Sequence, residues 1–145
     1  MPVSIKDQIT AAVQAAVGGE YGFPAADDKR DLPSTRVVED DETSSDSAYG
    51  YSVRQLPFVI AKAEVPVDRL PSQSREEYQD VMRARCNEMQ ASIEVALMAD
   101  PTVKSLVESI EYTGGSIAIE LGQLCFAESE FLVTFHTVKG DPYTQ

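Results

Sequence analysis

The sequence predicts an α+β fold: a mainly antiparallel sheet of four to five strands, with an N-terminal helix and one long helix packed on one face. Three observations lead to this prediction. Apolar residues recur every three to four positions in residues 5–17 and 78–97, as in amphipathic helices. Apolar and polar residues alternate in residues 109–138, as in strands. The length of 145 residues suits a single domain, 1–145.

The first expected helix begins near Ile5 and ends at Gly18-Gly19, a pair that favours a helix stop. Ser4 is the expected N-cap, and Asp7 carries a negative charge near the positive end of the helix dipole. The apolar side of this helix needs a partner, for which we expect the sheet.

The segment from Glu20 to Gly50 holds nine acidic and three basic residues, so its net charge of −6 is half of the formal −12 of the chain. Pro24, Pro33 and the polar run 41–47 predict loops, with one short strand at 35–39. We expect residues 40–50 or so to form a mobile acidic loop.

A second strand is predicted at 58–65, and Pro57 should mark its start or a sheet edge because proline has no N–H to donate. Pro66 and Pro71 should close this segment. The long helix then begins at a capping box formed by Ser74 and Glu77. Its core face is predicted to be Tyr78, Met82, Cys86, Met89, Ile93 and Leu97.

The long helix should end near Ala99, because Asp100-Pro101 favours the start of a new short helix over 102–107. Strands are then predicted at 109–113 and 117–121, and Gly114-Gly115 between them allow positive φ in a tight turn or a bulge. A last strand at 130–138 has apolar residues on both faces, which predicts a central position in the sheet or contact with another subunit.

Composition excludes several classes of function. Hydrophobic residues make up 43% of the chain, so disorder along its whole length is not expected. Twenty-four acidic against 12 basic residues argue against sequence-reading DNA binding and against a polybasic membrane anchor. No apolar run approaches the length of a membrane-spanning helix, and the N-terminus does not resemble a secretory signal. We therefore expect a soluble cytoplasmic protein.

No nucleotide, zinc or calcium motif is present, so we expect no cofactor and no enzyme. The single histidine, His136, is expected at a strand surface or interface. The acids Glu39 to Glu42 form the one candidate metal site, in which Asp40 and Asp41 would bind Mg²⁺ or Mn²⁺ in a hydrolase; a solvated acidic loop is the simpler interpretation. Cys86 and Cys125 are expected to be reduced, buried residues.

The acidic excess fits three interpretations. It can serve solubility through self-repulsion. It can belong to a DNA-mimicking inhibitor, whose carboxylates replace phosphates in the basic groove of a partner. It can also line a conduit through which DNA passes without binding.

Several motifs resemble those of the tail terminator, or tail-completion, proteins of long-tailed bacteriophages, the family that includes the minor tail protein U of phage lambda. The motifs are Tyr112-Thr-Gly-Gly115 and Phe131-x-Val-Thr-Phe135-x-Thr137-x-x-Gly140-Asp-Pro142. Further points of resemblance are Val37-Val38, Pro57-Phe-Val-Ile60 and Ala99-Asp-Pro-Thr-Val103. Where this chain has Phe135-His136, the relatives more usually have Tyr-Arg, which argues against carrying over a polar role at these two positions.

This resemblance implies a structural virion protein that caps the growing tail tube as a ring, commonly of six copies, stops its polymerisation and joins the tail to the head. Its partners would be other copies of itself, the tail tube protein and the head connector proteins. DNA would pass through an acidic lumen without specific binding, and the protein would reside at the head-proximal end of the tail, or in the host cytoplasm during assembly. No catalytic site is implied. The expected subunit contacts are strand edges and the interface candidates Asp40, Asp41, Glu42, Asp46 and His136. A head-to-tail connector or adaptor and a DNA-mimic inhibitor are the alternatives.

Overall fold

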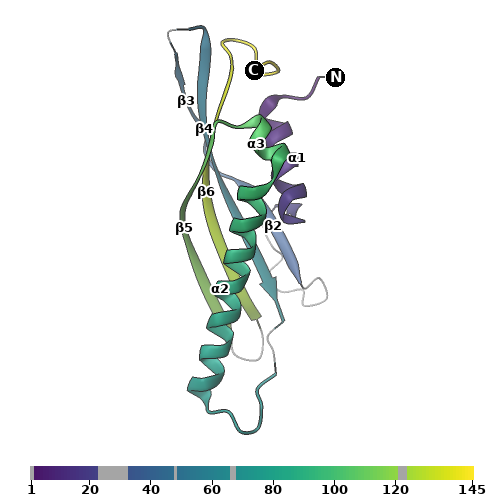
Figure 1. Ribbon diagram of the computed structural model, residues 1–145, viewed down its shortest axis with the longest axis vertical. Helices are drawn as coiled ribbons and strands as arrows, with labels where there is room; N and C mark the ends of the chain where they lie inside the picture. The colour runs from purple at the N-terminus through teal and green to yellow at the C-terminus, as the bar shows by residue number, and fades with distance from the viewer. Residues whose placement is uncertain (1, 23–32, 48, 66–67, 121–123) are drawn as a thin grey trace.

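A computed structural model describes residues 2–22, 33–47, 49–65, 68–120 and 124–145 and confirms the α+β class. The helices lie together on one side of a long, twisted sheet (Figure 1). The expectations for Pro24, for the acids at 27, 28 and 31 and for Pro66 lie outside the described residues. The elements are α1 (Ile5–Val17), β1 (Glu20–Tyr21), β2 (Ser34–Glu39), β3 (Thr43–Asp46), β4 (Tyr51–Glu64), α2 (Arg75–Ala99), α3 (Pro101–Leu106), β5 (Ser109–Glu120) and β6 (Leu124–Val138).

The described part of the sheet has six strands, against the four to five expected. Its main order is β1-β2-β4-β6-β5, and β3 pairs with the first part of β4. All pairs are antiparallel except β1 with β2, so the sheet is mixed. The predicted central position of the last strand is confirmed, because β6 lies between β4 and β5.

The expected acidic loop at 40–50 is wrong in its middle part, where Thr43–Asp46 forms β3. This strand pairs with residues 52–55 of β4, which begins at Tyr51 and is therefore seven residues longer at its start than expected. Hydrogen bonding to a neighbouring strand orders a polar segment that lacks apolar residues of its own. β3 could not be predicted from its own residues, because its order depends on pairing with β4.

Pro57 lies inside β4, neither at its start nor at a sheet edge. Its carbonyl oxygen accepts a hydrogen bond from the backbone N–H of Asp40, at 2.9 Å, in the short gap between β2 and β3. The N–H and C=O groups of one strand residue point to the same side, so the donor that proline lacks also faces this gap. The pairing of β4 with β6 therefore continues past Pro57 without interruption.

The two strands expected at 109–113 and 117–121 form a single strand, β5, over the described residues 109–120, with a register shift between Tyr112 and Gly114. The bulge is one of the two expected connections, and neither Gly114 nor Gly115 uses the positive φ that glycine allows. Gly115 is required for a different reason. A Cβ there would lie 2.5 Å from the hydroxyl of Tyr112 and 2.8 Å from both Gln90 Nε2 and the carbonyl oxygen of Glu128.

The helix signals are confirmed. The Ser4 hydroxyl accepts a hydrogen bond from the N–H of Asp7, and Gly18 ends α1 with a φ of 67°. The Ser74 hydroxyl accepts from the N–H of Glu77 at the start of α2. Asp100 caps α3 by accepting from the N–H of Val103. All six residues predicted for the core face of α2 are buried.

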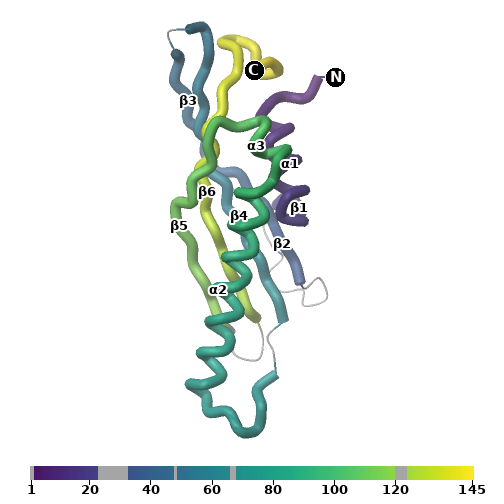
Figure 2. Tube along the Cα trace, in the orientation of Figure 1, coloured from purple at the N-terminus to yellow at the C-terminus, as the bar shows by residue number. Residues whose placement is uncertain are grey.

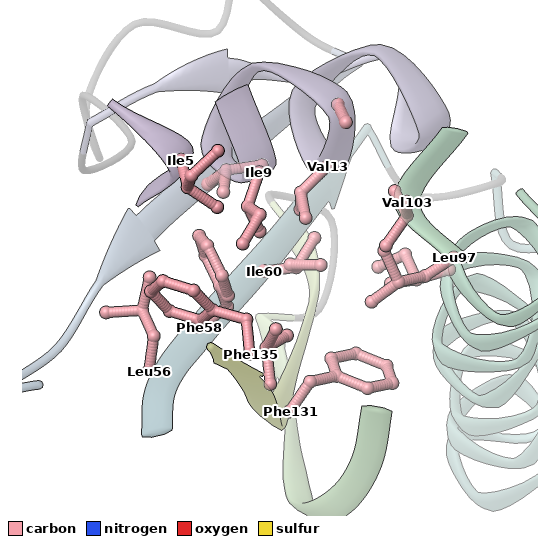
Figure 3. Close-up of a cluster of buried hydrophobic side chains, with 14 residues drawn as sticks. Ile5, Ile9, Val13, Leu56, Phe58, Ile60, Leu97, Val103, Phe131 and Phe135 are labelled. Atoms are coloured by element: carbon pink, nitrogen blue, oxygen red, sulfur yellow. The ribbon is translucent and has the colours of Figure 1, made fainter. Parts of the chain in front are cut away.

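The main core lies between the three helices and β2, β4 and β6 (Figure 3). Three phenylalanines are fully buried in the sheet layer, Phe58, Phe131 and Phe135, and Ile9 and Leu97 meet them from the helices. A second, smaller cluster fastens the first half of α2 to the sheet and consists of Tyr78, Met82, Cys86, Met89, Cys125 and Ala127.

The chain ends meet at one end of the molecule, where the N and C termini lie close together and β3 and the start of β4 also project (Figure 2). The N–H of Ile5 donates to the carbonyl oxygen of Pro142 at 3.0 Å, and the N–H of Val138 donates to the carbonyl oxygen of Thr144 at 2.8 Å. These bonds attach the C-terminal residues both to α1 and to the end of β6.

Candidate assembly surfaces

One face of the sheet has no described helix over it, and we call it the open face. Residues on this face alternate along β4 and β6 with the residues of the core. Six of its apolar side chains are half-buried: Val38, Val53, Val59, Phe126, Leu132 and Val138. Two small ones on the same face, Ala61 and Ala63, are buried. Two of the half-buried side chains sit next to each other across strands, since Val38 pairs with Val59. Leu132 pairs with Pro57 beside them. This is an apolar surface without a cover among the described residues.

Acidic side chains flank this apolar surface on the side of β5 and β6. Glu128 and Glu130 alternate with core residues of β6, and Glu111 pairs with Leu132 from β5. No ion pair joins any of these three carboxylates to another described side chain. By contrast, Arg36 on the far side of the same face is bound to Glu20. The open face therefore carries apolar residues with a net negative border.

The four acids from Glu39 to Glu42 separate into two pairs. Glu39 and Glu42 both reach the ammonium group of Lys6 on α1, at 3.5 and 3.3 Å, and Glu42 also contacts Arg54 at 3.3 Å. The hydroxyl of Thr10 donates to Glu39. These contacts fasten α1 to the sheet, and the two carboxylates together raise the pKa of Lys6 in spite of its partial burial. Of the interface candidates, Glu42 is thus engaged within its own chain.

Asp40 and Asp41 are exposed, and none of the ion pairs described above includes them. The carboxylate of Asp40 accepts a hydrogen bond from the N–H of Asp41 at 2.8 Å, which is a local turn contact. The two neighbouring glutamates are thus bound to cations of the chain, and the predicted metal ligands are not. Among the described residues, no group of three or more His, Cys, Asp or Glu side chains is arranged to hold a metal ion.

Asp46 and His136 lie at the projecting end of the sheet. Asp46 ends β3 and contacts Lys139 at 3.2 Å, which links β3 to the turn after β6. His136 lies on the open face, where its Nδ1 is 2.7 Å from a carboxylate oxygen of Glu108. Its ring also meets that of Tyr51 edge-on, with centroids 5.2 Å apart. His136 is therefore at a surface, as expected, and Asp40, Asp41 and Asp46 are exposed near the same hairpin.

Sequence reasoning did not find the open face as a unit. Its residues come from strands that are far apart in the sequence, and Val53 and Phe126 lay outside the predicted strands. The apolar residues on both faces of β6 were the one available signal.

None of the helices in the described residues is long and apolar enough to cross a membrane. No family model matches the chain. No curated protein matches it either.

Proposed function

We propose that this protein is a structural subunit that assembles with copies of itself into a ring and caps the tail tube of a long-tailed bacteriophage. In this role it stops tube polymerisation and joins the tail to the head. The observation that carries the proposal is the open face: long strands with apolar side chains that no described part of the chain covers. Apolar surface of this kind is typical of contacts between subunits.

A ring needs two different patches on each subunit, because one patch must meet another on the next copy. The open face supplies one patch. The outer edge of β5 supplies a second, since among the described strands this 12-residue strand pairs with β6 alone. The resemblance in the β5 and β6 motifs supports the tail terminator role over other ring-forming roles.

The acidic excess has a use in such a ring. Seven of the described cations are held in ion pairs within the chain: Lys6, Arg36, Arg54, Lys62, Arg83, Arg85 and Lys139. The charge offered to the outside is therefore mainly negative. A negative lumen repels DNA phosphates, so a genome passes through it without adhering.

Light scattering on a size-exclusion column at high protein concentration, with negative-stain images of the peak, tests this proposal. Six copies of 15.8 kDa give a mass of about 95 kDa, and we expect annular particles. A stable dimer would contradict the ring and would favour the DNA-mimic inhibitor, which predicts salt-sensitive binding to a basic partner. An adaptor without self-association predicts a monomer at every concentration.

A further inference from the structure

Two cysteines that are far apart in the sequence have their sulfur atoms side by side in the core. Cys86 on α2 and Cys125 on β6 are 39 positions apart, and their Sγ atoms are 3.5 Å from each other. Both side chains are fully buried. A disulfide bond needs a separation of about 2.05 Å, so the sulfurs have to approach by about 1.5 Å.

The surroundings of the pair allow a movement of this size. Besides their contact with each other, the thiols make long, weak hydrogen bonds to described residues, from Cys86 Sγ to the carbonyl oxygen of Ala118 at 3.9 Å and from Cys125 Sγ to that of Met82 at 3.8 Å. The adjacent apolar side chains on α2 are Met82 and Met89, and methionine adapts its shape more readily than branched residues do.

The pair also lies in the smaller cluster that attaches the first half of α2 to the sheet. The second half of α2 belongs to the main core through Ile93 and Leu97, whereas its first half is attached through the small cluster that contains the cysteines. The same region also contacts the sheet through the ion pair between Arg85 and Glu64, at 2.7 Å, and through the partly buried Ile117 and Ile119 of β5. We expect local opening to begin at this end of α2, because its cluster is smaller than the main core.

We propose that Cys86 and Cys125 form a disulfide site, which closes when the protein moves from a reducing to an oxidising environment and then locks the first half of α2 onto the sheet. The oxidant is a small-molecule disulfide of the glutathione type. One protein thiolate attacks it and forms a mixed disulfide, releasing one glutathione thiolate. The second protein thiolate attacks the protein sulfur of that mixed disulfide and releases the other. The protein loses two electrons and two protons, and two molecules of glutathione thiol result.

Formation of the disulfide is slow while the smaller core cluster around the two cysteines stays packed. Burial and the hydrogen bond with Cys86 raise the pKa of the Cys125 thiol to about 12, so its reactive thiolate is scarce at neutral pH. Neither sulfur is accessible to an oxidant in the closed cluster. Opening of the first half of α2 therefore precedes oxidation. If the protein is a virion component, as proposed above, the change of environment is release of the particle from the host cell.

The test uses the full chain, prepared reduced and then incubated with oxidised and reduced glutathione in several ratios. A low urea concentration, below the unfolding transition, speeds local opening. We expect the intact mass to fall by about 2 Da in oxidising mixtures and peptide mapping to find Cys86 joined to Cys125. The melting temperature should rise by about 10 °C, because the bond closes a loop of about 39 residues.

The single variants Cys86→Ala and Cys125→Ala are the controls, each compared with itself in the two redox conditions. Their melting temperatures should not respond to the glutathione ratio, whatever their absolute stability. Three outcomes would overturn the proposal: a dithiol that persists at equilibrium in every mixture, stable glutathione adducts or intermolecular dimers in place of the internal bond, or an internal bond that lowers the melting temperature. None of these readouts depends on ring formation, so the site and the proposed function fail separately.

Discussion

Replacing Gly115 with alanine adds a methyl group at a point of close approach between β5, β6 and α2. The new Cβ would lie 2.8 Å from the carbonyl oxygen of Glu128, a backbone atom that has little freedom to move. It would also lie 2.8 Å from Gln90 Nε2, which donates to the carbonyl oxygens of Ser116 and Glu128, at 3.0 Å each. The substitution therefore displaces either the backbone of β6 at Glu128 or the side chain of Gln90, which is bonded to both β5 and β6.

The expected cost follows from two opposing terms. Overpacking of this kind costs about 1–3 kcal/mol, while replacing a strand glycine with alanine recovers about 0.5–1 kcal/mol of conformational entropy. Gly114→Ala is the matched control, because a Cβ there meets nothing within 4 Å and its φ is not positive. The two variants share the entropy term, so their difference isolates the clash.

Urea unfolding monitored by circular dichroism measures both variants under identical conditions. We expect Gly115→Ala to be about 1–3 kcal/mol less stable than Gly114→Ala, which corresponds to a difference of about 3–10 °C in melting temperature. In a Gln90→Ala background the cost of Gly115→Ala should shrink by more than about 0.5 kcal/mol, since one of the clashing groups is gone. Equal stabilities of the two alanine variants would refute the reasoning.

Three other outcomes are expected. Phe135→Ala should lower the free energy of unfolding by about 3–5 kcal/mol, because this side chain is fully buried; a change below about 1 kcal/mol by the same urea assay would remove it from the core. Glu42→Gln should lower the free energy of unfolding by about 1–2 kcal/mol, because Glu42 has two cationic partners. The exposed Asp41→Asn should change it by no more than about 0.5 kcal/mol, and equal effects of the two substitutions would contradict the role of these ion pairs. The raised pKa of Cys125 adds stability that is present below pH 9.0, the ordinary value for a thiol, and is lost as the pH rises towards about 12. The free energy of unfolding of the reduced protein should therefore fall more steeply with pH over this range than that of Cys125→Ala. Parallel pH profiles of stability for the two proteins would contradict this contribution of Cys125.

The helices could be predicted from sequence because their signals are local. Ser4, Gly18, Ser74 and Asp100 act on their own helix ends, and the burial of the α2 stripe follows from spacing alone. The strand limits could not be predicted in the same way. β3 contains no apolar residue, and its order depends on hydrogen bonds to residues 52–55.

The candidate site was predicted only in part. The exposure of Asp40, Asp41 and Asp46 follows from the composition of the segment, and His136 lies at a surface as expected. The attachment of Glu39 and Glu42 to Lys6 depends on α1 crossing the end of β2, which no local pattern encodes. The same holds for the cysteine pair, whose members approach only through the packing of α2 on β6.

The central claim is that copies of this chain assemble through the open face, and a pair of charge insertions tests it most directly. Leu132→Glu places a carboxylate on the open face, and Val95→Glu places one on the outer side of α2, where the side chain is 68% exposed. Both variants should keep the circular dichroism spectrum of the parent. Light scattering should then find the ring mass for the parent and for Val95→Glu, and a monomer for Leu132→Glu. Rings of unchanged mass and stability from Leu132→Glu would contradict the account.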